Sequence, residues 1–322
     1  MKLFSLKPDL KIYFASDIHG SQKCFNKFIN AGAFYGADTL IMGGDITGKS
    51  IVNIETLPGG KFRSHFMGKE EAFETEGEEK DFEKAVKTAG FYPYACSKEE
   101  WQSCLRDTSR MDAVFEQLMK RSLEEWFAFA ERKLKGTGIR CYVMPGNDDP
   151  LIVTDILEES NTLINPDMKV TELGDGYTLV GCGYSNRTPW NSPRECGEEE
   201  LKTKLDRLMS QVSDPSRCIL AAHVPPYESG LDDAPKLKDM QVQSSGGQVE
   251  MAPAGSTAVR DIIEKYQPLL GLHGHIHEAH ATTKIGNTVC VNPGSDYGDG
   301  VLHGCILTVS KGRVKTDQLV SG

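Results

Sequence analysis

The hydrophobic pattern of the first 48 residues combines two short apolar runs with one amphipathic stretch between them. Residues 11–15 (KIYFA) and 39–42 (TLIM) have the length and composition of buried strands. Ser21 stands in a helix-capping position before apolar residues at helical spacing, and Gly32 lies near the expected helix end. The pattern predicts a strand–helix–strand unit whose right-handed crossover brings the loops after both strands to one edge of a sheet.

Further apolar runs bounded by turn residues occupy the second half of the chain. We expect strands at residues 140–144, 178–182, 218–222, 269–272, 288–291 and 302–309, and helices at 198–212 and 256–266. The stretch from His223 to Gly255 is polar, rich in proline and about thirty residues long. Loops of this length are often functional, so we expect a lid here.

A region of different character separates these two parts. Residues 69–84 contain eight acidic and three basic side chains, and residues 111–135 have strong helical periodicity. We interpret residues 50–135 as a largely helical insertion within a single domain that spans residues 1–322. It would hold an irregular stretch, an acidic helix around 69–88 and one or two long helices. A lid, a homodimer surface and a packing elaboration are all open roles for it.

Composition and charge narrow the classes of function. The net charge of −10 provides no basic surface for extended nucleic acid, although two bound divalent cations would still let the site take a small anion. The apolar beginning at residues 1–6 is too short for a secretory signal, and no later run suits a membrane span. Nine cysteines, scattered and without a CxxC pair, predict buried reduced thiols. We therefore expect a cytoplasmic protein that does not bind membranes.

Five polar segments that follow predicted strands carry the candidate chemistry. They are Asp17-Ile18-His19, Gly44-Asp45, Gly146-Asn147-Asp148, His223 and Gly274-His275-Ile276-His277. Each is common on its own, and a lone histidine after a strand is more often structural than a ligand. Together, carboxylate, imidazole and amide groups suit Mn²⁺, Fe, Zn²⁺ or Ni²⁺, and a shared carboxylate can bridge two metals. If its segment is extended, His275 points the same way as His277.

With these blocks the chain resembles the calcineurin-like metallophosphoesterase superfamily, whose motifs run D-x-H, G-D, G-N, H and G-H-x-H. The resemblance covers residues 11–295 apart from the insertion at 50–135. The runs DIHGS, GGDITGK, HVPP and VNPGS look most similar to the Icc-related phosphoesterases. The resemblance implies an α/β fold, a four-layer α/β/β/α sandwich of two mixed sheets flanked by helices, with metals at one edge.

The resemblance also implies roles for individual residues and a reaction. One metal would take Asp17, His19, Asp45 and His277, and the other would take Asp45, Asn147, His223 and His275. Asp45 would bridge the two metals together with a water or hydroxide. The implied activity is hydrolysis of phosphodiester or phosphomonoester bonds in a small substrate, nucleotide-like ones included, by in-line attack of the bridging hydroxide. Asp45, Asn147 and Asp148 would form the catalytic group.

The sequence departs from this pattern at Asp148, where many members have a histidine that protonates the leaving group. A carboxylate beside two divalent cations stays ionised and is a poor general acid. We therefore expect Asp148 to support Asn147 or a metal-bound histidine. The departure predicts slow catalysis and a preference for leaving groups that need little protonation, such as those of aryl phosphodiesters.

Cationic and polar residues outside the motifs are candidates for substrate binding. A guanidinium near an aromatic ring suits a phosphate with an attached ring, and two arginines flank Pro189-Trp190. The candidates are Lys49, Asn186, Arg187, Arg194 and Tyr227. An alternative is a protein-interaction scaffold that keeps the fold and metals with little catalysis, but every ligand position holds a competent residue. A protein phosphatase and a nuclease acting on long DNA are less favoured.

Overall fold

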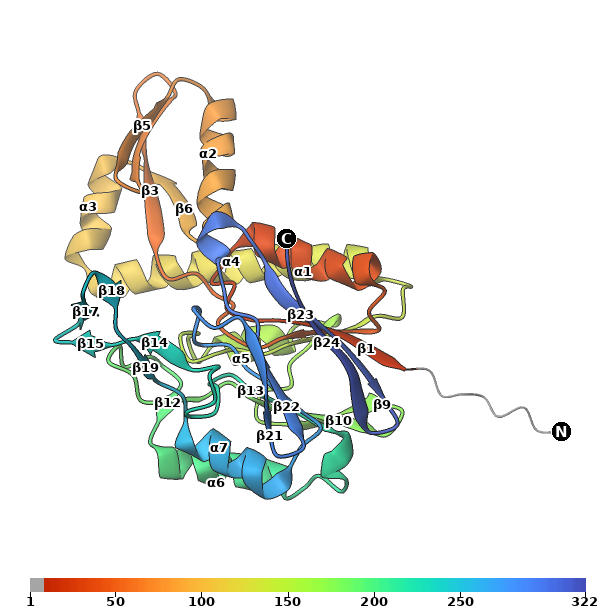
Figure 1. The fold of residues 1–322 in the computed structure, drawn as a ribbon. Helices are drawn as coiled ribbons and strands as arrows, with labels where there is room; N and C mark the ends of the chain where they lie inside the picture. Colours follow the sequence, from red (N-terminus) through yellow and green to blue (C-terminus); the bar gives the residue numbers. More distant parts are fainter. Residues whose placement is uncertain (1–8) are drawn as a thin grey trace.

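Two six-stranded sheets form the centre of the part that the computed structural model describes, residues 9–322 (Figure 1). The expectation about residues 1–6 lies outside the described residues. The first sheet has the order β24-β23-β1-β2-β7-β8. Its strands are β1 (Leu10–Ala15), β2 (Thr39–Met42), β7 (Arg140–Val143), β8 (Leu163–Ile164), β23 (His303–Ser310) and β24 (Arg313–Ser321). All four strands predicted in this sheet are confirmed, whereas β8 and β24 were not predicted.

The second sheet has the order β21-β22-β20-β13-β10-β9. Its strands are β9 (Val170–Gly174), β10 (Tyr177–Cys182), β13 (Cys218–Ala222), β20 (Leu270–Leu272), β21 (Ala281–Ile285) and β22 (Thr288–Asn292). The pairs β10–β13, β13–β20 and β20–β22 are parallel, as are β1–β2 and β2–β7 in the first sheet. Both sheets are mixed because antiparallel strands complete their edges.

Three apolar clusters separate four layers, so the expected α/β/β/α sandwich is confirmed. Ile12, Phe14 and Tyr142 face Leu179 and Leu270 between the sheets. The outer face of the first sheet packs against α1 (Gln22–Tyr35) and α4 (Thr108–Leu134), and that of the second against α6 (Glu198–Met209) and α7 (Thr257–Tyr266). Continuous apolar runs formed the buried strands because both of their faces are covered.

Local signals explain where α1 begins and ends. The Ser21 side chain accepts a hydrogen bond from the backbone N–H of Cys24, as the predicted N-cap requires. The helix continues past Gly32 to Tyr35 and ends at Gly36, which has a left-handed φ of 64°. All nine cysteines are buried and unpaired, as predicted. Among the described helices, none has the length and apolar character that crossing a membrane requires.

The insertion contains a sheet, so the expected irregular stretch is wrong. A four-stranded sheet of order β5-β4-β3-β6 projects from the sandwich beside α2 (Glu76–Thr88) and α3 (Lys98–Arg106) (Figure 1). Its strands are β3 (Ile51–Leu57), β4 (Lys61–Phe66), β5 (Lys69–Phe73) and β6 (Tyr92–Cys96). The acidic helix begins at residue 76, after a capping box between Thr75 and Glu78. Only one face of this small sheet is apolar, so its strands give short, interrupted patterns.

Helix α4 joins the insertion to the core of the sandwich. The Trp126 ring stacks on Phe25 of α1 at a centroid distance of 4.2 Å. Its indole N–H donates to the Gln22 side chain at 2.8 Å, so the ring's polar group is satisfied where the ring is buried. Part of the insertion is thus a packing layer over the first sheet.

Trp126→Ala is expected to lower the free energy of unfolding by about 3–5 kcal/mol, because it removes a large buried ring and leaves a cavity. Phe34→Ala is the matched control, since the Phe34 side chain is 80% exposed and its loss should change stability by less than about 0.5 kcal/mol. Urea unfolding followed by circular dichroism measures both. Equal effects of the two substitutions would show that α4 does not stabilise the core.

Candidate metal centre

The candidate ligands converge where parallel strands of both sheets end. Asp17 and His19 follow β1, Asp45 follows β2, Asn147 follows β7, His223 follows β13, and two histidines follow β20. The Asp17 N–H donates to Gly44 O at 3.0 Å and the His19 N–H donates to Asp45 O at 2.9 Å. These bonds hold the loops after β1 and β2 together.

The backbone at the cluster is strained at four ligand positions. Asp17, His19, Asp45 and His275 have φ values of 56°, 38°, 49° and 67°, in the left-handed region that residues with a Cβ rarely adopt. Each such residue costs on the order of 1–3 kcal/mol and persists only where surrounding packing imposes it. Concentrated strain of this kind is typical of functional sites.

Two glycines let the loops approach one another closely. A Cβ on Gly44, whose φ is 119°, would lie 2.5 Å from His223 Nδ1. A Cβ on Gly274 would lie 2.1 Å from Asp17 Oδ2. Any side chain at Gly44 or Gly274 would clash with a neighbouring ligand, so both positions require glycine.

Asp17, His19 and His277 form one group of candidate ligands. His277 Nε2 lies 3.5 Å from Asp17 Oδ1, and His19 Nε2 lies 3.8 Å from Asp45 Oδ2. The Nε2 atoms of His19 and His277 face each other at 3.0 Å. Two imidazole nitrogens at this distance need a proton or a cation between them, because two lone pairs repel.

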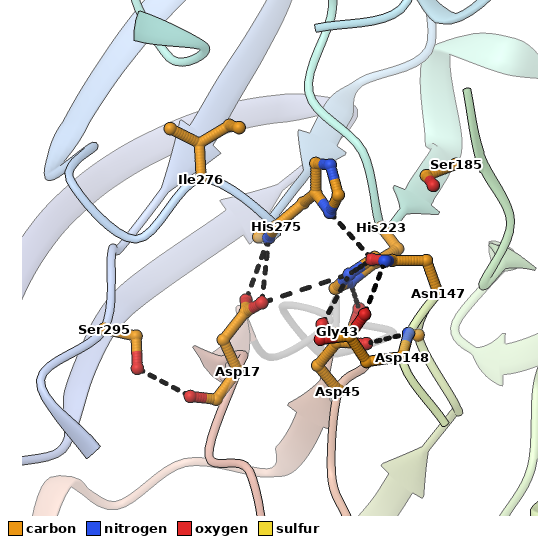
Figure 2. A network of polar contacts seen from close by, with 12 residues as sticks. Asp17, Gly43, Asp45, Asn147, Asp148, Ser185, His223, His275, Ile276 and Ser295 are labelled. Carbon is orange, nitrogen blue, oxygen red and sulfur yellow. Dashed lines mark hydrogen bonds and ion pairs between the residues drawn. The ribbon is translucent and has the colours of Figure 1, made fainter. Parts of the chain in front are cut away.

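Asp45, Asn147, His223 and His275 form the second group (Figure 2). His223 Nε2 lies 3.4 Å from Asp45 Oδ2 and 2.9 Å from Asn147 Oδ1. His275 Nδ1 lies 2.7 Å from the same amide oxygen. Asp45 contacts both groups, as a bridging carboxylate must. The structure thus brings all seven predicted metal ligands together.

Buried charge dominates the electrostatics of this cluster. Burial opposes ionisation, yet His223 and neighbouring histidines hold the pKa of Asp17 and of Asp45 well below the usual range. Burial also disfavours the imidazolium of His223, but Asp45 and Asp17 outweigh it and raise the pKa of His223 to about 10. Burial lowers the pKa of His19 and of His275 to about 4.

These residues fit divalent metal ions. Asp17 and Asp45 are buried, and among residues 9–322 their ion-pair partners are histidines, with no lysine or arginine. Buried carboxylates without a strong counter-ion favour a bound cation. Carboxylate oxygens, neutral imidazoles and an amide oxygen suit the transition metals expected above.

Asp149 supports the cluster, and sequence reasoning missed it. Its buried carboxylate accepts hydrogen bonds from the backbone N–H groups of Ile46, Thr47 and Gly146 and from the Thr47 hydroxyl, at 2.6–3.0 Å. Burial and the nearby Asp45 raise the pKa of Asp149 to about 6. Asp149 joins the loops after β2 and β7. Asp148 and Asp149 are adjacent, and no feature of the sequence indicated which of the two is buried.

Asp148 lies at the mouth of the cluster and is partly exposed. Its Oδ1 accepts hydrogen bonds from Asn147 Nδ2 at 2.9 Å and from the Ser192 hydroxyl at 2.6 Å. Its Oδ2 forms an ion pair with Lys49 Nζ. Its carboxylate also lies within reach of His19 and Asp45, as a third group that could hold a metal. Asp148 therefore contacts the Asn147 amide and the Lys49 ammonium while its carboxylate faces the cluster.

A cavity of about 1050 Å³ opens directly onto the cluster and is lined by Asp45, Asn147, Asp148, His275 and His277. Four of the five candidate substrate residues also line it, namely Lys49, Asn186, Arg187 and Tyr227. The prediction for Arg194 is wrong. Its guanidinium is buried and donates to Pro150 O, Leu151 O and Thr154 Oγ1, which secures the loop that precedes α5 (Val153–Glu158).

The histidine-rich segment is a turn and not the extended stretch that was expected. His275 has a positive φ, and the N–H of Ile276 donates to Gly274 O. His275 and His277 consequently reach different ligand groups. His273 lies apart, and its buried Nδ1 bonds to Ala222 O at 2.8 Å. The tight Gly274 contact with Asp17 explains why the chain turns here.

Comparison with known proteins gives limited sequence similarity. No family profile matches the chain. An uncharacterized protein of Methanocaldococcus jannaschii is 35% identical over 153 residues, which cover 47% of this chain and 62% of that protein. The chain thus spans less than two thirds of the length of this relative.

Solved structures show the fold. The crystal structure of TT1561 of Thermus thermophilus has a TM-score of 0.53 at 13% identity, covering 98% of this chain and 99% of that one. Another crystal structure has a TM-score of 0.57 at 14% identity with the same coverage. A novel archaeal phosphodiesterase matches over 97% of this chain and 99% of that one with a lower TM-score of 0.35. The chain therefore shares the overall fold of these two crystal structures, and its aspartate–histidine cluster lies where parallel strands of its two sheets end.

Metal binding is expected to release about one proton from His223. Both of its ring nitrogens lie 2.9 Å from oxygens that accept hydrogen bonds, Gly43 O and Asn147 Oδ1, and its pKa is raised to about 10. Because a metal competes with this proton at neutral pH, the apparent affinity for Mn²⁺ should rise about tenfold per pH unit between about pH 7 and 9.

Calorimetric titration with Mn²⁺ in buffers of different ionisation enthalpy measures the protons released. His65→Ala is the control, because the His65 side chain is 63% exposed and pairs with Glu70 on the insertion. His223→Gln should bind more weakly and release about one proton fewer. Unchanged proton release in His223→Gln would contradict this account of the cluster.

Proposed function

We propose that this protein is a dinuclear metal-dependent phosphoesterase that hydrolyses phosphomonoester or phosphodiester bonds of a small substrate. The observation that carries the proposal is the pair of ligand groups that share Asp45 beside a cavity of about 1050 Å³. One group contains Asp17, His19 and His277, and the other contains Asn147, His223 and His275. The ligand types suit Mn²⁺, Fe, Zn²⁺ or Ni²⁺, and the motifs favour an Icc-related enzyme.

The reaction needs chemistry that the residues alone do not have. When bound, two divalent metals act as Lewis acids that lower the pKa of a coordinated water and stabilise the charge of an in-line phosphoryl displacement. Asp17 and Asp45 supply the negative charge that holds such ions. The strained loops fix the ligands before a substrate arrives, so little reorganisation is needed during the reaction.

Lys49 and Asp148 shape the side of the cluster where the substrate enters. The Asp148 carboxylate keeps the Asn147 amide oxygen turned towards His223 and His275, because it accepts a hydrogen bond from the amide nitrogen. It also places the Lys49 ammonium on the cavity wall. A fixed cation there would stabilise the negative charge that develops on phosphoryl and leaving-group oxygens. No side chain in this account donates a proton to the leaving group.

The purified protein, reconstituted with Mn²⁺ or another of these metals, is expected to hydrolyse aryl phosphodiesters faster than alkyl phosphomonoesters. The screen compares phosphomonoesters, bis(p-nitrophenyl) phosphate and cyclic nucleotides. Asp45→Asn should lose at least about 100-fold in kcat/KM, because it weakens both metal positions. Asp38→Asn, an exposed aspartate before β2, is the control. If no metal supports turnover of any substrate, the interaction scaffold is the better description.

Asp148→Ala is expected to reduce kcat/KM by about 10- to 100-fold while metal content, measured by plasma mass spectrometry, stays near that of the unmodified protein. The loss follows from a freed Asn147 amide and an unpaired Lys49. Asp148→Asn keeps the side-chain shape, so its kcat/KM should lie between that of Asp148→Ala and that of the unmodified protein. Turnover as low as that of Asp45→Asn, with both metals retained, would mean that Asp148 takes part directly in the reaction.

A further inference from the structure

The cavity is much larger than a phosphate group and is lined by both polar and apolar residues. Drug-sized ligands occupy cavities of about 300–1,000 Å³, so a volume of about 1050 Å³ leaves room for a large organic group. Lys49 and Asp148 line it beside the ligand cluster, and Leu237, Val242 and Pro253 contribute apolar surface to it.

Leu237, Val242 and Pro253 belong to a flap at residues 233–253. It corresponds to part of the expected lid and consists of three short antiparallel ladders (Figure 1). The ladders pair β14 (Asp233–Pro235) with β19 (Met251–Pro253), β15 (Leu237–Lys238) with β16 (Gln241–Val242), and β17 (Ser244–Ser245) with β18 (Gln248–Val249). Leu237 and Val242 are direct cross-strand partners, and both line the cavity.

The base of the flap is fixed to the body of the protein. The buried Asp232 carboxylate accepts hydrogen bonds from the backbone N–H groups of Glu228, Ser229 and Gly255. The Asn186 side chain donates to Gly255 O at 3.3 Å. These bonds anchor the base of the strands that carry Leu237 and Val242, which both line the cavity.

Apolar side chains stand open to solvent along this cavity. Trp190 is 64% exposed and Val242 is 53% exposed, and both line the cavity. Phe115 of α4 lines it as well. Exposed apolar groups gathered around a concave surface mark a place where an apolar ligand is buried.

Prolines line this cavity beside polar residues that include Asn186, Arg187, Thr188 and Tyr227. Pro150, Pro189, Pro235 and Pro253 line the cavity, and none has a backbone N–H to donate. Recognition of a base depends on hydrogen bonds to its edges as well as on stacking. A hydrocarbon chain needs no such partners and gains free energy from each methylene that it buries.

We propose that the natural substrate is an amphiphilic phosphoester, with its phosphoryl group at the metal centre and a hydrocarbon chain along Trp190, Leu237 and Val242. This inference rests on the proposed phosphoesterase function and adds the class of substrate. The hydrocarbon chain is bound by the flap and by the loop that carries Trp190, which lie outside the metal-binding motifs.

A homologous series tests the proposal. Methyl, butyl and octyl p-nitrophenyl phosphodiesters share one leaving group, so differences in kcat/KM report binding of the alkyl chain. We expect kcat/KM to rise about threefold for each methylene from methyl to butyl, and further to octyl, at concentrations below micelle formation. Thymidine 5′-(p-nitrophenyl phosphate) provides the nucleotide comparison and should be a poorer substrate than the octyl ester.

Three variants locate the binding of the chain. Leu237→Ser combined with Val242→Ser should remove most of the dependence on chain length. Trp190→Ala should reduce the dependence on chain length. Trp190 is exposed, so the substitution should leave folding intact. Val249→Ser is the matched control, because Val249 lies on the same flap, is 50% exposed and does not line the cavity. Its chain-length dependence should equal that of the unmodified protein.

The outcomes separate this inference from the proposed function. Metal-dependent turnover with no dependence on chain length would overturn the amphiphile and leave the phosphoesterase intact. A thymidine ester that exceeds the octyl ester, with a loss in Trp190→Ala, would identify a nucleotide-like substrate in its place. A chain-length effect that persists in the flap variants would also overturn the proposed site. No turnover of any ester would remove the proposed function, and the amphiphile with it.

Discussion

The negative charge of Asp17 and Asp45, buried together at the meeting point of two sheets, is the constraint on which the rest of the site depends. Ionised carboxylates are costly to remove from water unless cations compensate them. Here the compensation comes from histidines, of which His223 lies close to both carboxylates. Histidines can exchange a proton for a metal, whereas a lysine or arginine would keep its charge. The choice of partner therefore leaves the centre open to metal ions.

Packing in the sandwich offsets the free-energy cost of the strained backbone at the site. Strained backbone at Asp17, His19, Asp45 and His275 is imposed by parallel strands that are buried on both faces. Parallel strands in both sheets end at the same edge, which places ligands from widely separated parts of the chain side by side. Asp149 then joins two of these loops through four hydrogen bonds. The ligands thus lie on short loops, and contacts between segments far apart in the sequence hold these loops in place.

Selectivity would come from the more peripheral elements. Lys49 and Asp148 set the charge at the mouth of the centre, and α4 and the flap give the cavity its apolar walls. Because these parts lie outside the metal-binding motifs, they can differ between proteins of one fold while the metal centre is kept.

The sequence by itself determined the strands of continuous apolar residues and the set of candidate ligands, because these depend on local patterns and on the chemistry of single side chains. The α/β/β/α layering was implied by the resemblance of the motifs to a known superfamily. Only the tertiary structure decided which polar residues are buried. Arg187 lines the cavity, whereas Arg194 is buried and donates to backbone carbonyls. Asp149 is buried and accepts backbone hydrogen bonds, whereas Asp148 is partly exposed and accepts from Ser192. The tertiary structure also showed a sheet within the insertion, whose strands are apolar on one face alone. Burial and pairing depend on contacts between distant segments, and no local pattern encodes these contacts.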